Sequence, residues 1–301
     1  MRGCFLAVKT CVILNPTAGS AENTDKLQGR LSRLAGCDIQ ITSQPGDAEK
    51  FALAAAANGC ELIVAAGGDG TLNEVINGIA ERNSEVRVGL VALGTGNDFA
   101  RSIDLPSNVD DCLDVIAAGY TQAIDMVRVT SDRVRYFINV SAGGFSGIVD
   151  EKLTPEIKQT WGPLAYLRTA AAAFSELRAY ETTIVLDDAE RLSVSLYNVI
   201  IGNGRYVAGG IPVAPEALLN DGVFDIILIP QTATTDLPVL VTQILRGKHL
   251  SNETVIYRRA AKVAVRSNPG MWFNVDGELV GNEPATFEIM AGAVQFVVAQ
   301  K

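Results

Sequence analysis

Residues 62–79 read LIVAAGGDGTLNEVINGI, and this stretch decides the fold. Its first five residues form an apolar run typical of a buried strand. From Leu72 to Ile79 apolar residues recur at the i, i+3, i+4, i+7 spacing of an amphipathic helix. The glycine-rich turn between them therefore joins a strand to a helix. In that geometry, backbone N–H groups and the positive end of the helix point at the turn, where they can bind phosphate.

The glycines of the turn have two interpretations. Gly67, Gly68 and Gly70 let the backbone approach a phosphate at a point where a Cβ would collide. Asp69 would repel a phosphate, so we expect it to hold a cation or the water of a cation. The alternative is a tight turn in which glycine is needed for sterics alone. Neither the Walker pattern nor the dinucleotide-binding pattern matches the chain, so the phosphate hypothesis rests on a different loop.

Composition limits the partners of the protein. The 301 residues are 48% hydrophobic, which is enough for about two domains with full cores. Lys and Arg number 25 and Asp and Glu 34, giving a net charge of -9. This charge argues against nucleic-acid binding and against attachment to an anionic membrane by charge alone. Any lipid contact should therefore be local and apolar.

The cysteines and the N-terminus predict a cytoplasmic protein. Five cysteines show no C-x-x-C spacing, and all lie before residue 113, as expected for small buried residues in a reducing compartment. The apolar run before Lys9 has only five residues, Cys4 to Val8, too few for a signal-peptide core. No apolar run approaches the ~18 residues that a membrane span needs.

Strands and helices alternate over the first 125 residues, which predicts a parallel sheet with helices on both faces. The expected strands are 3–14, 38–42, 62–66 and 86–92, and the expected helices are 22–35, 47–58, the one from Leu72 and a short one after Gly96. In such a sheet, ligands bind outside the carboxyl ends of the strands. Three loops should meet there: Asn15–Ser20, the Asp69 loop, and the Leu93–Arg101 turn with Thr95 and Asn97.

Strand-like runs replace this alternation after about residue 125, which predicts a mostly antiparallel β-sandwich over 126–287. The expected strands are 123–130, 135–141, 182–186, 192–202, 222–229, 257–266, 271–276, 285–290 and 294–298. One helix is expected over Trp161–Tyr180, with an apolar stripe from Trp161 to Leu177. The stripe is either core or a surface that contacts lipid.

Two acidic turns lie in the second half. The first, around Asp221, is suited to a hard cation with oxygen ligands. The second, Asp276-Gly277-Glu278, carries two carboxylates that could take a proton from a hydroxyl, although Asp-Gly is also an ordinary hairpin turn. The single histidine, His249, lies in a polar connector, where we expect it to be solvated or locally bonded. The chemistry favours direct phosphoryl transfer.

The ordered motifs resemble the soluble bacterial diacylglycerol kinase-like lipid kinases, relatives of the sphingosine kinases. They run nearly end to end: Asn15–Gly19, Gly67–Glu74, Leu93–Ala100, Gly202–Gly204 with Gly209-Gly210, Ala214–Gly222 and Asp276–Glu278. The Gly-Gly-Asp-Gly-Thr loop alone also resembles NAD kinases. The resemblance implies a nucleotide-binding domain over 1–125, to which the strands of about 288–301 return, and a lipid-binding domain over 126–287.

The family pattern implies ATP and Mg²⁺ as cofactors. Nucleotide contacts would fall on Asn15, Pro16, Thr17, Ala18, Gly19, Thr42, Gly67, Gly68, Asp69, Gly70, Thr71, Leu72, Asn73, Thr95 and Asn97. Magnesium would bind the Asp221 side chain with backbone oxygens near Leu218 and Val223. Glu278 or Asp276 would accept the proton, and Asp69, with Asp98, would order the waters of a magnesium ion.

The leading hypothesis is an ATP-dependent kinase that phosphorylates diacylglycerol during transient contact with the inner face of the membrane. Another hydroxyl acceptor (a sphingoid base, phosphatidylglycerol or NAD) and a non-catalytic nucleotide-binding regulator are the alternatives. No nucleic-acid partner is expected, and the sequence leaves open whether the chain forms a homodimer.

Overall fold

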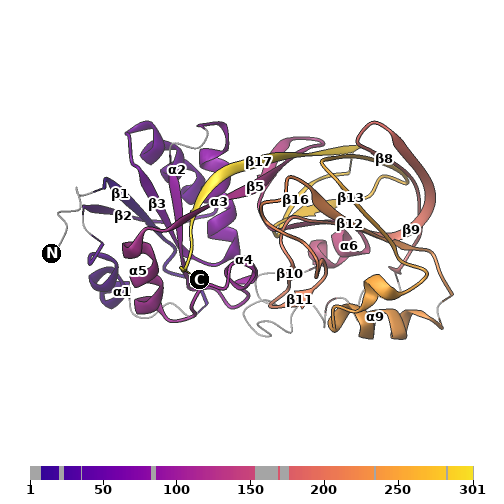
Figure 1. The fold of residues 1–301 in the computed structure, drawn as a ribbon, viewed down its shortest axis with the longest axis horizontal. Helices are drawn as coiled ribbons and strands as arrows, with labels where there is room; N and C mark the ends of the chain where they lie inside the picture. Colours follow the sequence, from indigo (N-terminus) through magenta and orange to yellow (C-terminus); the bar gives the residue numbers. More distant parts are fainter. Residues whose placement is uncertain are drawn as a thin grey trace. The chain divides into compact units, whose positions relative to one another are not determined.

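The computed structural model describes residues 8–19, 24–34, 36–82, 86–152, 169, 176–233, 235–282 and 284–300. The chain divides into two compact units (Figure 1). The first contains Met1–Ile124 and Gly292–Lys301, and the second contains Asp125–Ala291. The first is α/β and the second is mostly antiparallel β, which confirms the predicted fold class.

A parallel sheet forms the centre of the first unit, in the strand order β17-β4-β3-β1-β2. Its own strands are β1 (Thr10–Leu14), β2 (Cys37–Ile41), β3 (Leu62–Gly67) and β4 (Arg87–Ala92). Its helices are α1 (Thr24–Leu31), α2 (Asp47–Ala57), α3 (Asp69–Ile79), η1 (Ala80–Arg82), α4 (Asp98–Ser102) and α5 (Val109–Ala118). The helix expected over 22–35 is shorter in the structure, and α5 was not predicted.

Helices cover both faces of this sheet. Val12, Val64 and Val91 point to one face, where they pack with Leu27 of α1 and Leu113 of α5. Elsewhere in this unit, α2 and α3 pack on each other so closely that a Cβ on Gly78 would collide with the Glu49 carbonyl. The helices thus bury the strands, and the strand ends remain as the place where loops gather.

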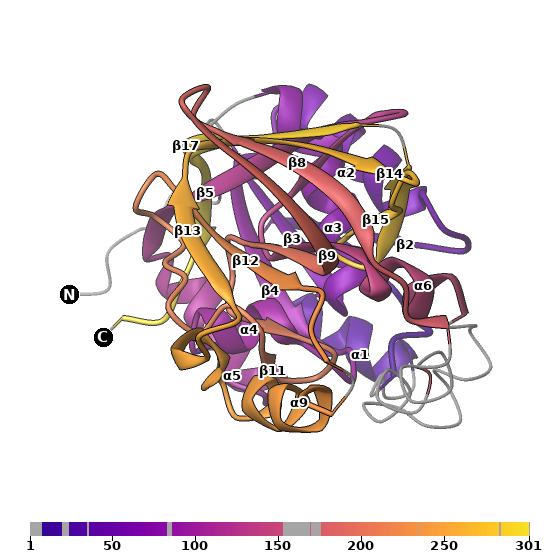
Figure 2. The same ribbon diagram turned by 90° about the vertical axis from the view of Figure 1, so that its right-hand side faces the viewer.

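The second unit is built on antiparallel strands in the order β16-β15-β7-β9-β8-β14-β17, with β12 between β9 and β13. The strands are β5 (Thr121–Thr130), β6 (Val134–Phe137), β7 (Val140–Gly144), β8 (Tyr180–Leu186), β9 (Glu190–Gly202), β10 (Tyr206–Val207), β11 (Ile211–Pro212), β12 (Phe224–Pro230), β13 (Ile256–Ala260), β14 (Lys262–Asn268), β15 (Phe273–Val275), β16 (Glu278–Gly281) and β17 (Ala285–Val297). The helices are α6 (Phe145–Lys152), α9 (Leu237–Leu245) and η4 (His249–Ser251). Figure 2 shows this unit from its strand-rich side.

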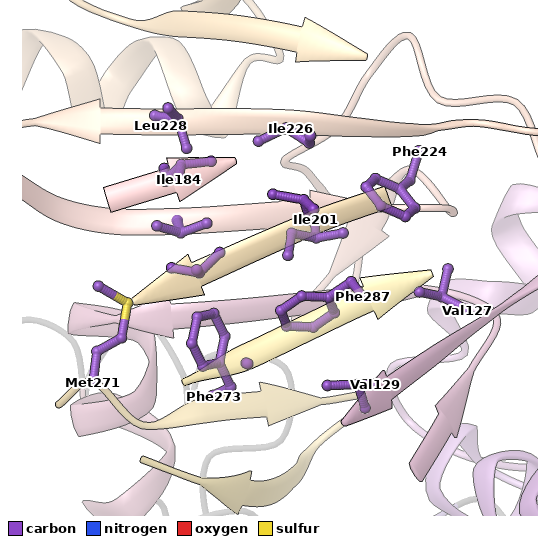
Figure 3. Packing of buried hydrophobic residues seen from close by; sticks show 14 of the residues in the cluster. Val127, Val129, Ile184, Ile201, Phe224, Ile226, Leu228, Met271, Phe273 and Phe287 are labelled. Atoms are coloured by element: carbon purple, nitrogen blue, oxygen red, sulfur yellow. The ribbon is translucent and has the colours of Figure 1, made fainter. Parts of the chain in front are cut away.

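Aromatic rings fill the core of the second unit (Figure 3). The rings of Phe273 and Phe287 lie edge to face with centroids 5.3 Å apart, and Phe137 meets Phe287 in the same manner at 6.4 Å. All three are fully buried. Each such side chain contributes roughly 1.5–3 kcal/mol to the free energy of unfolding. This core holds β6, β15 and β17 together.

Three stretches of predicted strand are divided differently in the structure, and carboxylates explain two of these differences. The run 135–141 breaks into β6 and β7 because the N–H groups of Ile138 and Val140 donate to Asp276. The run 257–266 breaks into β13 and β14 because the N–H groups of Ala261 and Lys262 both donate to Asp187 Oδ1. The two strands expected over 285–298 form the single strand β17, which continues through a glycine at φ +61°.

Other expectations have mixed outcomes. His249 is buried rather than solvated, and its Nε2 lies 2.9 Å from the Val213 carbonyl oxygen. Cys11, Cys60 and Cys112 are buried as predicted, whereas Cys37 is only partly buried. Apart from Leu177, the apolar stripe from Trp161 lies outside the described residues. None of the helices in the described ranges has the length and hydropathy of a membrane span.

Candidate functional site

Three loops meet at the carboxyl ends of the parallel strands in the first unit. The Asn15 side chain donates a hydrogen bond to Thr71 Oγ1 over 3.2 Å, which ties the loop after β1 to α3. A Cβ on Gly19 would lie 3.1 Å from Thr95 Cγ2, which brings the same loop against the turn after β4. The predicted convergence of these loops is therefore present.

Asn15 and Thr42 hold the ends of neighbouring strands. Asn15 Oδ1 accepts hydrogen bonds from the N–H and the hydroxyl of Thr17, which closes the turn through Pro16 and Ala18. Thr42, directly after β2, donates its N–H to the Leu14 carbonyl at the end of β1 over 2.9 Å. Both residues lie at the same edge of the sheet as the glycine loops.

The glycines of the central loop separate into two groups. A Cβ on Gly67 would collide with the Thr71 side chain, and a Cβ on Gly68 would lie 3.1 Å from Gly94 Cα. Packing therefore requires glycine at these positions. Gly70 is different, because no atom outside its own helix lies within 4 Å of the position of its Cβ, its φ is not positive, and it is exposed.

The first turn of α3 suits an anion. Its N-cap residue is Gly68, which has no side chain to accept a hydrogen bond from the first N–H groups. Those groups carry the positive end of an eleven-residue helix. Glycine inside a helix costs about 0.5–1 kcal/mol relative to alanine. Neither packing nor backbone torsion therefore explains glycine at position 70.

Asp69 has a structural role that its sequence position did not reveal. Its carboxylate accepts the N–H groups of Asp98 and Phe99, both over 3.1 Å, and so caps α4 from another element. The N-cap residue of α4, Asn97, has a left-handed conformation and does not cap the helix itself. Instead, its side chain donates to the Gly94 carbonyl over 2.7 Å. Asp69 thus fixes the third loop against the second.

Two further residues of the central motif stabilise the fold. Leu72 is 2% exposed and its N–H donates to the Gly68 carbonyl, so it belongs to the core and we do not retain it as a nucleotide ligand. Glu74 accepts the N–H groups of Gly46 and Ala48 over 3.0 Å each and thereby caps α2. Asn73 is also buried, and its carbonyl and side-chain oxygens accept hydrogen bonds from Asn77.

In the second unit, Asp276 and Glu278 flank a hairpin turn between β15 and β16. Both carboxylate oxygens of Asp276 accept a backbone N–H, from Ile138 over 3.3 Å and from Val140 over 2.9 Å. Glu278 is 37% exposed, and its partners are the guanidinium groups of Arg133 and Arg135, each at 2.8 Å. The sequence reading found both carboxylates but missed the two arginines, which come from the hairpin of β5 and β6.

Arg259 occupies the acidic turn that was expected to hold magnesium. Its guanidinium pairs with Asp221 and lies 3.3 Å from Asp225 Oδ1. Asp221 also accepts the Val223 N–H over 3.3 Å. Asp225 is 1% exposed, and burial raises its pKa to about 6 against the opposing effects of Tyr257 and Arg259.

Some of the groups at this turn that could bind magnesium already have protein partners. The Asp221 carboxylate already has two partners. The Leu219 carbonyl oxygen accepts a hydrogen bond from the Asp125 N–H over 2.6 Å. Within the described ranges, no group of three or more His, Cys, Asp or Glu side chains is placed to hold a metal. Arg259 places a positive charge at Asp221.

Two family models match the chain and divide it as the fold does. The diacylglycerol kinase catalytic domain matches residues 9–129. The YegS C-terminal NAD kinase beta sandwich-like domain matches residues 139–298.

Curated relatives and solved structures agree with these models. A diacylglycerol kinase of Staphylococcus epidermidis is 35% identical over 280 residues, covering 92% of this chain and 87% of the relative. One from Staphylococcus saprophyticus is 34% identical, covering 92% and 90%. A crystal structure from Bacillus anthracis str. Sterne shares the fold with a TM-score of 0.83 at 22% identity, covering 99% and 98%. The chain is therefore a kinase of the bacterial diacylglycerol kinase-like family.

Proposed function

We propose that this protein transfers the γ-phosphoryl group of ATP to the primary hydroxyl of a membrane lipid, with diacylglycerol as the acceptor and phosphatidic acid as the product. Gly70 at the uncapped start of α3 is the observation that carries this proposal. Diacylglycerol is proposed as the acceptor because the chain is similar over nearly its whole length to the diacylglycerol kinases of the staphylococci.

The first unit would hold the nucleotide. The N–H groups at the start of α3 and the loops at Asn15 and Thr95 offer the donors that phosphate oxygens need. ATP would arrive as its magnesium complex, which keeps several waters and needs only one or two carboxylates. Asp69 and Asp98 are the carboxylates beside the first turn of α3 and would bind those waters. Bound magnesium would offset the negative charge that develops on the phosphoryl oxygens.

Glu278 would be the general base. The Asp276 carboxylate accepts hydrogen bonds from two backbone N–H groups that define the break between β6 and β7, so its position is fixed by the fold. The Glu278 side chain is 37% exposed, and its partners are side chains that can move. It would accept the proton of the lipid hydroxyl as the oxygen attacks phosphorus, while Arg133 and Arg135 orient its carboxylate.

The test is transfer of labelled phosphate from ATP to a panel of acceptors in mixed micelles: diacylglycerol, sphingosine, phosphatidylglycerol and NAD. We expect labelled phosphatidic acid. Because a general base contributes about 10²–10⁴-fold, Glu278→Gln should lower kcat by at least about a hundredfold. If another acceptor is labelled in preference to diacylglycerol, that acceptor is the substrate. ATP binding without transfer to any acceptor would instead support the alternative of a non-catalytic nucleotide-binding regulator.

Asp276→Asn is the matched variant for the base. It should lower the melting temperature because an amide cannot accept two N–H donors as well as a carboxylate does. Glu278→Gln should leave the melting temperature nearly unchanged, since exposed ion pairs contribute about 0–1 kcal/mol. If Asp276→Asn abolishes transfer with normal melting while Glu278→Gln retains it, Asp276 is the base.

A further inference from the structure

Asn203 lies in the centre of the motif Gly202-Asn203-Gly204, which has no role in the site described above. It directly follows β9 and is 0% exposed. A Cβ on Gly202 would collide with the Ala214 methyl group, and a Cβ on Gly204 would collide with the Asn139 side chain. Glycine on each side therefore lets the chain pack closely around a buried asparagine.

The side-chain amide of Asn203 joins two segments of the second unit through its nitrogen. Nδ2 donates to the Asp125 carbonyl over 3.0 Å and to the Ile138 carbonyl over 2.7 Å. The Asn203 N–H donates to the Asn139 carbonyl over 2.9 Å. An amide nitrogen has the two N–H groups that two carbonyl oxygens require, whereas an ionised Asp has no donor and Ser has one. Asparagine is therefore suited to this position by its pair of donors.

The oxygen of the same amide has no such contacts. Oδ1 is buried, and no group of the described residues donates a hydrogen bond to it. Burying a polar atom without a partner is unfavourable, and an apolar side chain would fill the same space without this penalty. The two hydrogen bonds from Nδ2 therefore favour a role for Asn203 in holding Asp125 and Ile138 together.

On one side of Asn203, Asp125 supports the acidic turn around Asp221. The Asp125 N–H donates to the Leu219 carbonyl over 2.6 Å. The Asp125 carboxylate accepts the Gly222 N–H over 2.7 Å. Asp125 thus binds this turn at two points, and Asn203 binds the carbonyl oxygen of Asp125 in turn.

On the other side, Ile138 supports the turn of the proposed base. Ile138 and Val140 donate their N–H groups to the Asp276 carboxylate over 3.3 Å and 2.9 Å. Asp276 comes two residues before Glu278, in the tight turn between β15 and β16. Because Asn203 binds the Ile138 carbonyl, it fixes the peptide segment that holds Asp276, and the place of Glu278 depends on that turn.

We infer that Asn203 is a positioning residue for the general base. Its amide holds the break between β6 and β7, and through Asp276 it sets the place of the Glu278 carboxylate. This role rests on the proposed function in one respect, since it takes Glu278 as the base. Asn203 is buried and acts through the turn rather than on the substrate. By binding Asp125 as well, it ties the acidic turn around Asp221 to the turn of the base.

A double-mutant cycle with Glu278→Gln tests this role. Asn203→Ala should lower kcat for diacylglycerol at least about tenfold, because a small displacement of a base has a large effect on rate. The Kd for a non-hydrolysable ATP analogue should stay the same. In the Glu278→Gln background, Asn203→Ala should lower kcat no further, because the base that it positions is absent. An equal loss of kcat in both backgrounds overturns the inference.

Hydrogen exchange of the full-length protein, followed by mass spectrometry, tests the same link without using kinase activity. Asn203→Ala should make the peptides that contain residues 138–140 and 276–278 exchange roughly fivefold faster. The reason is that the net loss of one hydrogen bond changes a local opening equilibrium by about that factor. Unchanged exchange in both peptides overturns the inference.

Asn198→Ala is the matched control. Asn198 is also a buried asparagine of β9, and its Oδ1 accepts the Ser146 N–H over 2.9 Å, away from the Asp276 turn. This variant should keep the kcat of the wild type and the wild-type exchange of residues 138–140 and 276–278. If Asn198→Ala changes kcat and exchange as much as Asn203→Ala does, both asparagines only stabilise the fold, and Asn203 does not position the base.

Further outcomes separate this role from the proposed function. If Asn203→Ala does not fold, Asn203→Ser, which keeps a single hydroxyl donor, supplies the same comparisons. Full kcat in Glu278→Gln refutes both the base and its positioning by Asn203. If the wild type transfers phosphate to none of the acceptors, the proposed function fails. The exchange measurement then still decides whether Asn203 holds the Asp276 turn.

Discussion

Replacing Gly70 by alanine should raise the stability of the protein and weaken its binding of nucleotide. The position has a helical backbone, and the new Cβ would meet no atom of the protein within 4 Å. Alanine should therefore add about 0.5–1 kcal/mol to the free energy of unfolding. At about 2–4 °C per kcal/mol, the melting temperature should rise by about 1–4 °C. A methyl group at the start of α3 would hold a phosphate away from the N–H donors, and losing about 1.4 kcal/mol of that interaction raises the Kd about tenfold.

Isothermal titration with the non-hydrolysable magnesium complex of an ATP analogue, together with thermal melting, measures both effects. Gly29→Ala is the matched control, because Gly29 lies in α1, is exposed and has equally open space around its Cβ. It should show the same stabilisation with an unchanged Kd. If Gly70→Ala binds nucleotide as tightly as the wild type, the glycine is not there for a phosphate, and the observation that carries the proposed function is lost.

Three further variants separate structural from chemical roles. Asp69→Ala should lower kcat by more than tenfold, or about 1.4 kcal/mol, and also destabilise the protein by about 0.5–2 kcal/mol through loss of the α4 cap; normal melting would contradict the cap. Glu74→Ala should destabilise by a similar amount, since two N–H groups of α2 lose their acceptor, with the Kd for nucleotide unchanged. Asp225 has a pKa of about 6, above its unfolded value of about 3.9, so the native state binds the proton more tightly and its stability rises as the pH falls from about 6 to about 4. Asp225→Asn should remove this rise in stability, which is worth up to about 3 kcal/mol. Urea unfolding of the wild type and the variant at about pH 4.5 and about pH 7.5 measures the difference. An identical pH dependence in the two proteins would refute the role of Asp225.

Hydrophobic periodicity predicted the α/β half well because three of its strands, β1, β3 and β4, are almost fully buried. The runs before the loops are continuous and apolar, and each ends at a turn rich in glycine or proline. Helix α5 was overlooked although local signals existed. The Asn108 side chain accepts the Asp110 N–H at its start, and Gly119 ends it at φ +71°. These capping residues would have predicted the helix even though its apolar spacing was not considered.

The β-sandwich was harder to predict because distant side chains set its strand ends. Nothing near residue 139 in the sequence indicates that Asp276 will bind the N–H groups on both sides of it. Likewise, Asp187 stops β13 from joining β14 across more than seventy residues. Hydrophobic patterns report which residues are buried, whereas these breaks depend on tertiary hydrogen bonds.

Arg259 illustrates the same limit of prediction from sequence at the acidic turn around Asp221. The sequence places carbonyls and carboxylates together there, and that composition suits a cation. In the fold, β13 lies next to β12 and brings a guanidinium to Asp221 and Asp225. A motif gives the chemistry of its own residues but not the charge that a neighbouring strand adds.

Most acidic residues of the motifs turn out to accept backbone N–H groups. Asp69 does so at α4, Glu74 at α2 and Asp276 between β6 and β7. A carboxylate in such a position accepts charge-assisted hydrogen bonds while it is ionised, and protonation weakens them because the charge is lost and one oxygen becomes a donor. Proton transfer to it would therefore weaken the fold at each turnover. Glu278 is bound by arginine side chains instead, which can adjust when it gains a proton. That difference in partners, rather than its sequence position, is the reason to assign it the role of base.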